Sequence, residues 1–299
     1  LYDQIVAGFI LLTTLGNPTS DYAGLIMIIA APVFVTATIV PAYLIATRFT
    51  TRPAALTGVT VFALLPGTVL LYSMVGFYDH SAGEVFFQTL GVFGFIAAIS
   101  VAQQTQPVWE LIADRDITAL RRPLLYSVGA GITAALYMWA WPPGILLVGF
   151  TGIFLALKIT SDVYHDQSPE PIAFVGSISM FVAGLLMIVP LKEVAIASAT
   201  GYNLLQIILP LGVGFGCLFL AFLARQWESR ELDESWYPAV VGILLFVVTA
   251  IFEGFVGGLF NSLINRIGFS TGATARTVGE AKPPLSQAPA FEFIYSQYR

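Results

Sequence analysis

The sequence predicts an all-α, polytopic membrane protein. Hydrophobic residues make up 57% of the chain and charged residues only 10%, and the mean hydropathy is +0.82. Soluble domains carry about 25% charged residues. Apolar runs of about 20 residues, the length of helix that crosses a bilayer, recur along the chain. Runs of this kind cannot close a β-barrel, so the spans are expected to be helices.

Eight apolar segments qualify as membrane spans or nearly do. Residues 1–21 are expected to form an external segment in the membrane interface, because the apolar stretch 2–15 is short and ends in Gly16-Asn17-Pro18. Residues 258–299 mix Gly, Pro, Ser and Thr and are predicted to form a long external loop. The eight-helix region 22–257 lies between them, with predicted spans at 22–47, 54–74, 85–102, 124–141, 144–160, 172–190, 204–224 and 237–257.

The basic residues predict the orientation of the chain. Alternate loops on one side carry eight Lys or Arg residues, whereas the short loops of the other side carry only Lys192. Because Lys and Arg are enriched in cytoplasmic loops, the first side is predicted to be cytoplasmic. Residues 76–81, the Trp141-Pro142-Pro143 turn and residues 258–299 are then outside the cytoplasm. The eight basic residues are Arg48, Arg52, Arg115, Arg121, Arg122, Lys158, Arg225 and Arg230.

Several classes of function fit the sequence poorly. Nucleic-acid binding is excluded, because the net charge is -5 and there is no basic stripe to neutralise phosphates. The single cysteine, Cys217, lies in an apolar run and excludes a disulfide framework and any cysteine-based metal site within the chain. The lack of an internal repeat and of charge in the spans argues against a transporter or channel. A structural membrane scaffold would explain the composition and stays as an alternative.

The first candidate site is Gly76-Phe77-Tyr78-Asp79-His80. Asp79 follows an apolar run, where an unpaired carboxylate is costly unless it faces a polar cavity or a cation. With His80 or Ser81 it supplies oxygen and imidazole donors suited to Mg²⁺ or Mn²⁺, although one carboxylate alone is too few to hold either ion. The alternative is that Asp79 and His80 only cap the external end of a helix.

The second candidate is Thr277-Val278-Gly279-Glu280 in the predicted external loop. Ala281-Lys282-Pro283-Pro284 follows, and its prolines stiffen the loop so that the Glu280 carboxylate can be presented in a fixed direction. A single glutamate in a loop is usually solvated. Glu280 is a candidate site residue because Asp79 is predicted to lie on the same side of the membrane.

The order of these motifs resembles the catalytic subunit of archaeal oligosaccharyltransferases, which have a GT-C fold and are dolichyl-phosphate-linked oligosaccharide:protein asparagine glycosyltransferases. The resemblance extends through essentially the whole chain. Members of the family have thirteen spans, so this chain is expected to be an internal fragment that lacks the first span and the last several. The ordered run is Pro66-Gly67, Gly76-Phe77-Tyr78-Asp79-His80, Glu84-Val85-Phe86-Phe87, Trp141-Pro142 and Thr277-Val278-Gly279-Glu280-Ala281.

The resemblance implies roles for individual residues. Asp79 corresponds to the first acidic residue of the family's second D-x-D or D-x-H motif, a ligand of Mn²⁺ or Mg²⁺. Ser81 stands at the third position of that motif, and His80 is a substitute ligand. Glu280, in the TIXE-like motif that begins at Thr277, corresponds to the carboxylate that holds the amide of the acceptor asparagine.

Two positions depart from the family pattern. The family usually has Asp or His where Ser81 stands, and Tyr72 falls where relatives commonly have an arginine important for activity. Tyr72 is therefore included with the candidate catalytic residues, and a degenerate, non-catalytic paralogue stays as an alternative. A further alternative function is that of a different GT-C glycosyltransferase, which uses a polyprenyl-phosphate sugar and does not require Glu280.

The resemblance implies metal-dependent transfer of a glycan from a dolichyl-phosphate-type lipid to the asparagine of an N-x-Ser/Thr sequon, at the outer face of the cell membrane. The partners would be a lipid-linked oligosaccharide donor, an acceptor polypeptide and membrane lipid. An amide nitrogen is a poor nucleophile, so such a site needs carboxylates and a cation that neutralises the departing lipid phosphate. The family's other catalytic carboxylate and its sequon-reading motif fall outside this chain, so the 299 residues alone are not expected to turn over.

Overall fold

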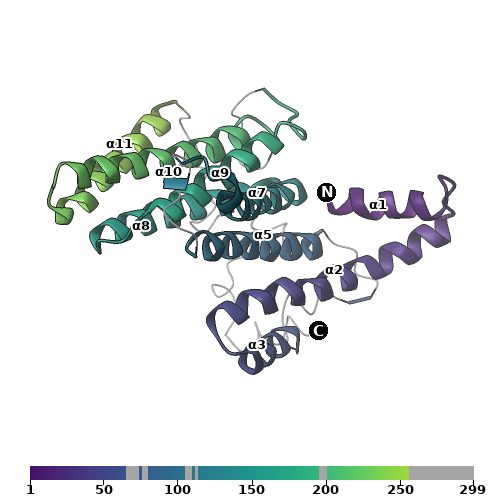
Figure 1. The fold of residues 1–299 in the computed structure, drawn as a ribbon. Helices are drawn as coiled ribbons and strands as arrows, with labels where there is room; N and C mark the ends of the chain where they lie inside the picture. The colour runs from purple at the N-terminus through teal and green to yellow at the C-terminus, as the bar shows by residue number, and fades with distance from the viewer. Residues whose placement is uncertain (65–73, 76–79, 105–109, 112–113, 195–200, 256–299) are drawn as a thin grey trace, which may run out of the picture. The chain divides into compact units, whose positions relative to one another are not determined.

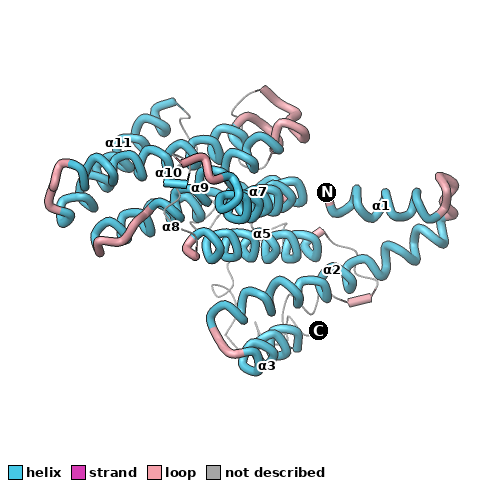
Figure 2. The backbone as a smooth tube through the Cα atoms, viewed as in Figure 1, coloured by secondary structure: helices cyan, strands magenta, loops and turns pink. Residues whose placement is uncertain are grey.

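The computed structural model describes residues 1–64, 74–75, 80–104, 110–111, 114–194 and 201–255. These residues form helices joined by short turns, and none of them belongs to a strand (Figures 1 and 2). The predicted all-α fold is confirmed. The α-helices are α1 (Tyr2–Thr13), α2 (Ser20–Phe49), α3 (Arg52–Leu64), α5 (Ser81–Ala102), α7 (Ile117–Ala140), α8 (Ile145–Tyr164), α9 (Glu170–Leu186), α10 (Leu205–Ser229) and α11 (Tyr237–Phe255), with short 3-10 helices η1 (Pro142–Gly144) and η2 (Glu234–Trp236).

Within the described part of the chain, six helical segments are long and apolar enough to cross a membrane: α2, α5, α7, η1 with α8, α10, and η2 with α11. The polytopic character predicted from the sequence is therefore confirmed. The remaining two predicted spans, 54–74 and 172–190, correspond to the shorter helices α3 and α9, of 13 and 17 residues. The described part of α3 ends at the edge of the residues that the structure describes. Residues 2–15 form the 12-residue helix α1, and its placement in the membrane interface stays a prediction.

Capping residues start two of the helices earlier than hydropathy alone predicts. The span predicted at 124–141 belongs to α7, which begins at Ile117 because Asp116 caps it. The Asp116 Oδ1 accepts hydrogen bonds from the backbone N–H groups of Thr118 and Ala119, both at 3.1 Å. At the start of α2 the Thr19 hydroxyl accepts from the Tyr22 N–H at 3.3 Å. The two capping side chains thus satisfy N–H groups that have no partner inside their helices.

Helix α2 is longer than a membrane span. Its 30 residues correspond to about 45 Å at about 1.5 Å per residue, against about 30 Å for the hydrocarbon core. Helix α1 runs back along its first half, and α5 begins beside Ala31, where Ala82 and Val35 complete a buried cluster. The hairpin of α1 and the first part of α2 therefore extends beyond the start of α5 (Figure 1). Its buried contacts comprise Tyr2, Val6, Ile10 and Ala30, with Ala23, Ile26 and Phe34 packed against them.

The other helices pack closely because small residues lie where they meet. Helix α5 packs between α2 and α7, α9 packs between α7 and α10, and α8 packs on α10. A Cβ added at Gly131 of α7 would lie 2.5 Å from the Ser179 carbonyl oxygen of α9, and one at Gly214 of α10 would lie 2.7 Å from the Phe181 ring. Small residues let helix backbones approach in a lipid environment, where apolar surface alone gives little association.

A second buried cluster joins α8, α9 and α10 with the start of α11. Cys217 is buried in it and has a packing role. The Tyr237 hydroxyl donates a 2.9 Å hydrogen bond to the Leu220 carbonyl, so its polar end is satisfied inside the cluster. The buried members are Leu155, Ala156, Ile159, Val163, Ile172, Ala173, Cys217, Leu220, Ala221, Ala224, Tyr237 and Val241.

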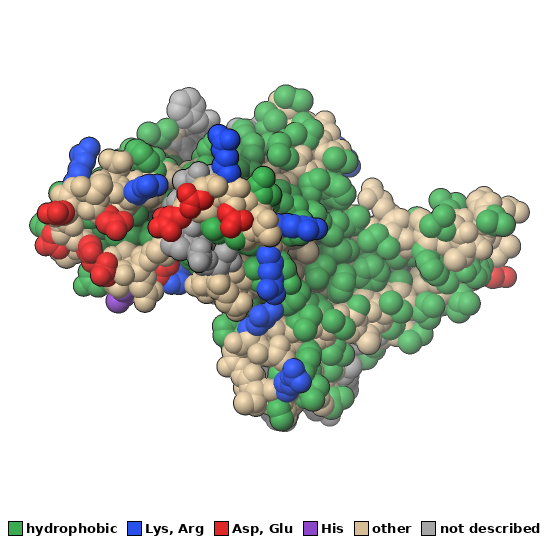
Figure 3. Space-filling model, in the orientation of Figure 1, with side chains coloured by type: hydrophobic (Ala, Val, Ile, Leu, Met, Phe, Trp, Pro, Cys, Tyr) green, Lys and Arg blue, Asp and Glu red, His purple; other side chains and the backbone are tan. Residues whose placement is uncertain are grey.

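The chain divides into two compact units, Leu1–Val241 and Gly242–Arg299. The boundary falls within α11, whose remaining residues are the described part of the second unit. Many large hydrophobic side chains are exposed, among them Val33, Phe150 and Phe246. Figure 3 shows apolar side chains over much of the visible surface, with charged side chains gathered toward one end. Such exposure would favour aggregation in water, but it suits helices that face lipid.

We expect Gly131→Ala to destabilise the protein by about 1–3 kcal/mol, because the added methyl overlaps the α9 backbone. Gly129, in the same helix, has nothing within 4 Å of its Cβ direction, so Gly129→Ala should be neutral or stabilise by up to about 1 kcal/mol. Thermal unfolding in detergent measures both. Equal effects of the two substitutions would contradict the packing described for α7 and α9.

Candidate functional site

The structure describes only part of the predicted site. Tyr72, Asp79, Thr277 and Glu280 lie outside the described residues. His80 and Ser81 are described, and they stand at the start of α5, where His80 is the N-cap and Ser81 the first helical residue. The predicted assembly of Asp79 with Glu280 therefore stays a prediction.

His80 pairs with Glu84 one helical turn later. The His80 Nε2 lies 3.0 Å from the Glu84 Oε1, with the His80 side chain 56% exposed and that of Glu84 18% exposed. The His80 side chain makes no capping hydrogen bond, although its carbonyl accepts from the Glu84 N–H at 3.0 Å. This partner was not among the predictions for His80, which were a helix cap or a metal ligand. The spacing of four residues was the available signal, because such residues are neighbours on a helix surface.

The described residues at this end do not make a metal site by themselves. They offer one imidazole, one carboxylate and the Ser81 hydroxyl, and the first two are paired with each other. Mg²⁺ and Mn²⁺ prefer several oxygen ligands, including carboxylates. Among the residues that the structure describes, no group of three or more His, Cys, Asp or Glu side chains is arranged to hold a metal ion. A site for either ion depends on Asp79 and on ligands from elsewhere.

The Trp139 carbonyl, near the end of α7, joins three separate segments. It accepts a 2.6 Å hydrogen bond from the Tyr202 hydroxyl and a 3.1 Å hydrogen bond from the Leu1 nitrogen. Residues 187–204 connect α9 to α10, and within them the Lys192 N–H donates to the Tyr202 carbonyl at 2.9 Å. The Lys192 Nζ lies 5.6 Å from the centre of the Tyr202 ring, within the range of a cation–π contact. These contacts fix the α9–α10 connection against the end of α7.

Burial raises the pKa of Tyr202 above its usual value of 10.0, because the charged form loses hydration. The neutral hydroxyl is therefore favoured in the folded protein. The stability that the protonated Tyr202 contributes is fully present below the ordinary tyrosine pKa. It is lost as the pH rises through the raised pKa of Tyr202 in the folded protein. Around neutral pH, Tyr202 keeps its proton and its hydrogen bond to Trp139.

Two buried amides shape the start of α10. The Gln206 Oε1 accepts from the Asn203 N–H at 3.0 Å, and the Asn203 Oδ1 accepts from the Leu205 N–H at 2.9 Å. Both side chains are only 1% exposed. The reciprocal arrangement is a variant of the capping box, and the spacing of Asn203 and Gln206 in the sequence was a signal that the sequence analysis missed.

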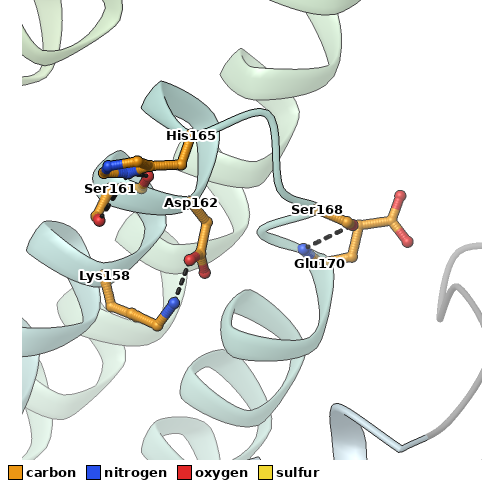
Figure 4. A network of polar contacts seen from close by, with 6 residues as sticks. All are labelled: Lys158, Ser161, Asp162, His165, Ser168 and Glu170. Carbon is orange, nitrogen blue, oxygen red and sulfur yellow. Dashed lines mark hydrogen bonds and ion pairs between the residues drawn. The ribbon is translucent and has the colours of Figure 1, made fainter.

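A separate polar network lies at the predicted cytoplasmic end of α8 (Figure 4). Asp162 is 3% exposed and forms an ion pair with Lys158, while the His165 Nδ1 lies 2.7 Å from the Ser161 carbonyl oxygen. The sequence alone favours a solvated turn with His165 beside Asp162 and Asp166 at this place, but Asp162 belongs to α8 and is buried. The contact between Lys158 and Asp162 compensates the burial of a charge, and nothing in the network indicates a metal site.

The sequence also matches a known protein family. The family described as oligosaccharyl transferase STT3, N-terminal, matches residues 23–251. The chain belongs to the STT3 family. It is also 46% identical, over 290 residues, to the dolichyl-monophosphooligosaccharide–protein glycotransferase AglB of Haloferax volcanii. This match covers 96% of the chain but 27% of that relative.

Solved structures of archaeal oligosaccharyltransferases share the fold of this STT3-family chain. The AglB of Archaeoglobus fulgidus in complex with an inhibitory peptide and a dolichol-phosphate matches with a TM-score of 0.79 and 17% identity, over 93% of this chain and 32% of that one. An oligosaccharyltransferase of the same organism, in complex with Zn and sulfate, matches with a TM-score of 0.71 and 20% identity, over 90% of this chain and 33% of that one. The chain thus spans about a quarter to a third of these relatives.

Family membership and the apolar helices make the STT3-family chain part of a multi-pass membrane protein. The side-chain contacts described above for His80, Trp139 and Asn203 lie at helix ends: the start of α5, the end of α7 and the start of α10. The contacts of Trp139 hold the α9–α10 connection against the end of α7. Residues at such an end can be presented to water, lipid headgroups or a bound substrate.

We expect Tyr202→Phe to destabilise the protein by roughly 0.5–1.5 kcal/mol, because it removes the hydrogen bond to the Trp139 carbonyl and keeps the ring beside Lys192. Tyr164, which is 52% exposed at the end of α8, provides the matched control Tyr164→Phe. Chemical or thermal unfolding in detergent measures both variants. A loss as large in the control as in Tyr202→Phe would show that the Trp139 contact does not hold the α9–α10 connection.

Proposed function

We propose that the protein containing this chain is the catalytic subunit of an oligosaccharyltransferase, which transfers a glycan from a dolichyl-phosphate-type lipid to the asparagine of an N-x-Ser/Thr sequon. The 46% identity to the Haloferax volcanii AglB over 96% of the chain carries this proposal. At that identity the relative's named activity is the best guide to chemistry. The order of the Asp79 and Glu280 motifs supports the same reaction.

The proposed partners are a lipid-linked oligosaccharide, an acceptor polypeptide and membrane lipid. An Archaeoglobus fulgidus relative with the same fold forms a complex with a peptide and a dolichol-phosphate, which supports partners of these two classes. The distribution of Lys and Arg supports a catalytic face outside the cytoplasm, on the side of the start of α5. The protein would then act on chains at the outer face of the cell membrane.

The two predicted carboxylates have separate roles in this proposal. Glu280, with Thr277 in the same motif, binds the amide of the acceptor asparagine and so orients a weak nucleophile. Asp79, which directly precedes His80 in the sequence, contributes a ligand for Mn²⁺ or Mg²⁺, with His80 or Ser81 as further donors. A divalent cation stabilises negative charge on a departing phosphate. The proposed metal site needs ligands outside the described residues. Any test of the proposal therefore includes removal of the metal.

The decisive assay measures transfer from a lipid-linked donor to a fluorescent N-x-Thr peptide by purified full-length protein, with Mn²⁺ or with EDTA. We expect EDTA to abolish transfer and Asp79→Ala and Glu280→Ala each to lower it on the order of 10²-fold or more, because each removes a charged group that acts in the transition state. Glu234→Ala, at the predicted cytoplasmic end of α11, is the matched control and should transfer normally.

Loss of transfer in Asp79→Ala alone, with Glu280→Ala unaffected, would instead favour a GT-C glycosyltransferase of another specificity. No transfer by a folded wild-type preparation would favour a degenerate paralogue. The departures at Ser81 and Tyr72 are the observations that favour this second outcome.

The position of Ser81 gives a further prediction. Ser81 is the first residue of α5, where a carboxylate is favoured by the helix dipole, and the family pattern has Asp or His there. Ser81→Asp should therefore lower the Mn²⁺ concentration for half-maximal transfer on the order of tenfold, because ligand charge raises affinity for hard cations. Ser81→Ala should change it less than about twofold. A large loss in Ser81→Ala would contradict the weak role assigned to the hydroxyl.

A further inference from the structure

The first turn of α5 is covered by a side chain from far upstream in the sequence. Gly83 is the third residue of α5, and Tyr2 of α1 lies directly against it. A Cβ added at Gly83 would lie 2.8 Å from both the Cβ and the Cδ2 of Tyr2 and 3.0 Å from its Cγ. The nearest atoms include the base of the Tyr2 side chain, which cannot rotate away. Only glycine therefore allows this approach without movement of one helix.

Tyr2 is itself fixed on several sides. Its side chain is 1% exposed, and its ring packs edge-to-face on Phe34 of α2, with ring centres 4.9 Å apart. Phe34 in turn packs against Phe86 of α5, at 5.6 Å between ring centres. The residue before Tyr2 is held by the hydrogen bond from the Leu1 nitrogen to the Trp139 carbonyl. Interlocked aromatic rings have little freedom to yield, because the interior is densely packed.

Helix α2 holds the same turn from a second side. Ala82 is fully buried in a cluster with Ala31 and Val35 of α2. The backbone of α5 at Ala82 and Gly83 is therefore wedged between α1 and α2. His80 and Ser81 immediately precede this wedge, and Asp79 adjoins them in the sequence. Any displacement of Gly83 is transmitted to these residues through the helix backbone.

We propose that Tyr2 and Gly83 are positioning residues for glycan transfer, which set the placement of the start of α5 and of the His80–Ser81 step. Neither touches a reactant. The inference rests on the proposed function, because it assigns the contact a role in that reaction. Misplacement of a reacting group by about 1 Å can slow catalysis by about 10²-fold. A methyl group at Gly83 lies closer than 3.0 Å to two atoms of Tyr2, so one of the two helices must shift.

The test measures transfer by the full-length protein carrying Gly83→Ala, normalised to the folded fraction from thermal unfolding. We expect kcat to fall about 10- to 100-fold while the KM for the acceptor peptide changes less than about threefold, because the contact affects the geometry of reaction rather than ground-state binding. Gly94→Ala is the matched control on the same helix, since its Cβ would lie 2.5 Å from the Thr133 Oγ1. It should lower stability but leave kcat per folded molecule unchanged.

A second substitution separates positioning from general damage. Tyr2→Gly removes all three atoms that lie nearest to the added methyl, so the double variant Tyr2→Gly/Gly83→Ala should recover at least tenfold in kcat over Gly83→Ala. Tyr2→Phe keeps those three atoms and should give no such recovery. Rescue through the first change and not the second is specific to this contact.

Three results would overturn the inference while the wild type still transfers glycan: normal kcat in Gly83→Ala, equal slowing in Gly94→Ala, or no recovery in the double variant. In those cases the proposed function stands and the contact has only a structural role. Absence of transfer by the folded wild-type protein overturns the proposed function, and the inference with it.

Discussion

The close approach of helix backbones at small residues is the constraint on which this fold depends. Inside a membrane, apolar side chains gain little by leaving lipid for one another, so association depends on packing at short range. Gly131 on α7 and Gly214 on α10 both face α9, where a Cβ would overlap Ser179 or Phe181. Helix α9 is short and is held between two neighbours by these contacts. This packing fixes α7, α9 and α10, and so their ends, relative to one another.

The described polar groups divide between two structural tasks. Inside the bundle, hydroxyl groups donate to carbonyls of their own helix, as Thr38 does to Phe34 at 3.0 Å, and so satisfy these donors away from water. At the helix ends, side chains join different segments, as Tyr202 does with Trp139. The second kind of contact fixes loops relative to helices. Rigid ends of this kind suit a site whose reacting groups come from several connections.

Composition and apolar run length were sufficient to predict the fold class, because the requirement to satisfy backbone groups in lipid leaves few alternatives. The same signals placed the ends of the helices inaccurately. Hydropathy cannot detect that Asp116 caps α7, which therefore begins well before the apolar stretch. These signals also could not separate α9 from longer spans. The helix beginning at Ser81 was predicted to start at residue 85, because its first turn is not strongly apolar.

The candidate site was less accessible to sequence reasoning. The motif around Asp79 could be singled out through its residue types and order, and its role stays a prediction. The pair of His80 with Glu84 and the cap formed by Asn203 and Gln206 had local spacing signals that can be read from the sequence. The contact of Tyr2 with Gly83 had none, because it joins residues that are distant in the chain. Only the packing of three helices brings them together.

The length of α2 has a consequence for the surroundings of the start of α5. Ala31, which lies beside that start, is eleven residues beyond Ser20, a rise of about 16 Å along the helix axis. Helix α1 doubles the thickness of this projecting part. Among the described residues, the start of α5 thus lies at the base of a projecting two-helix hairpin. The Leu1 nitrogen, at the start of α1, and the Tyr202 hydroxyl both bind the Trp139 carbonyl, so the hairpin also borders the end of α7 and the α9–α10 connection.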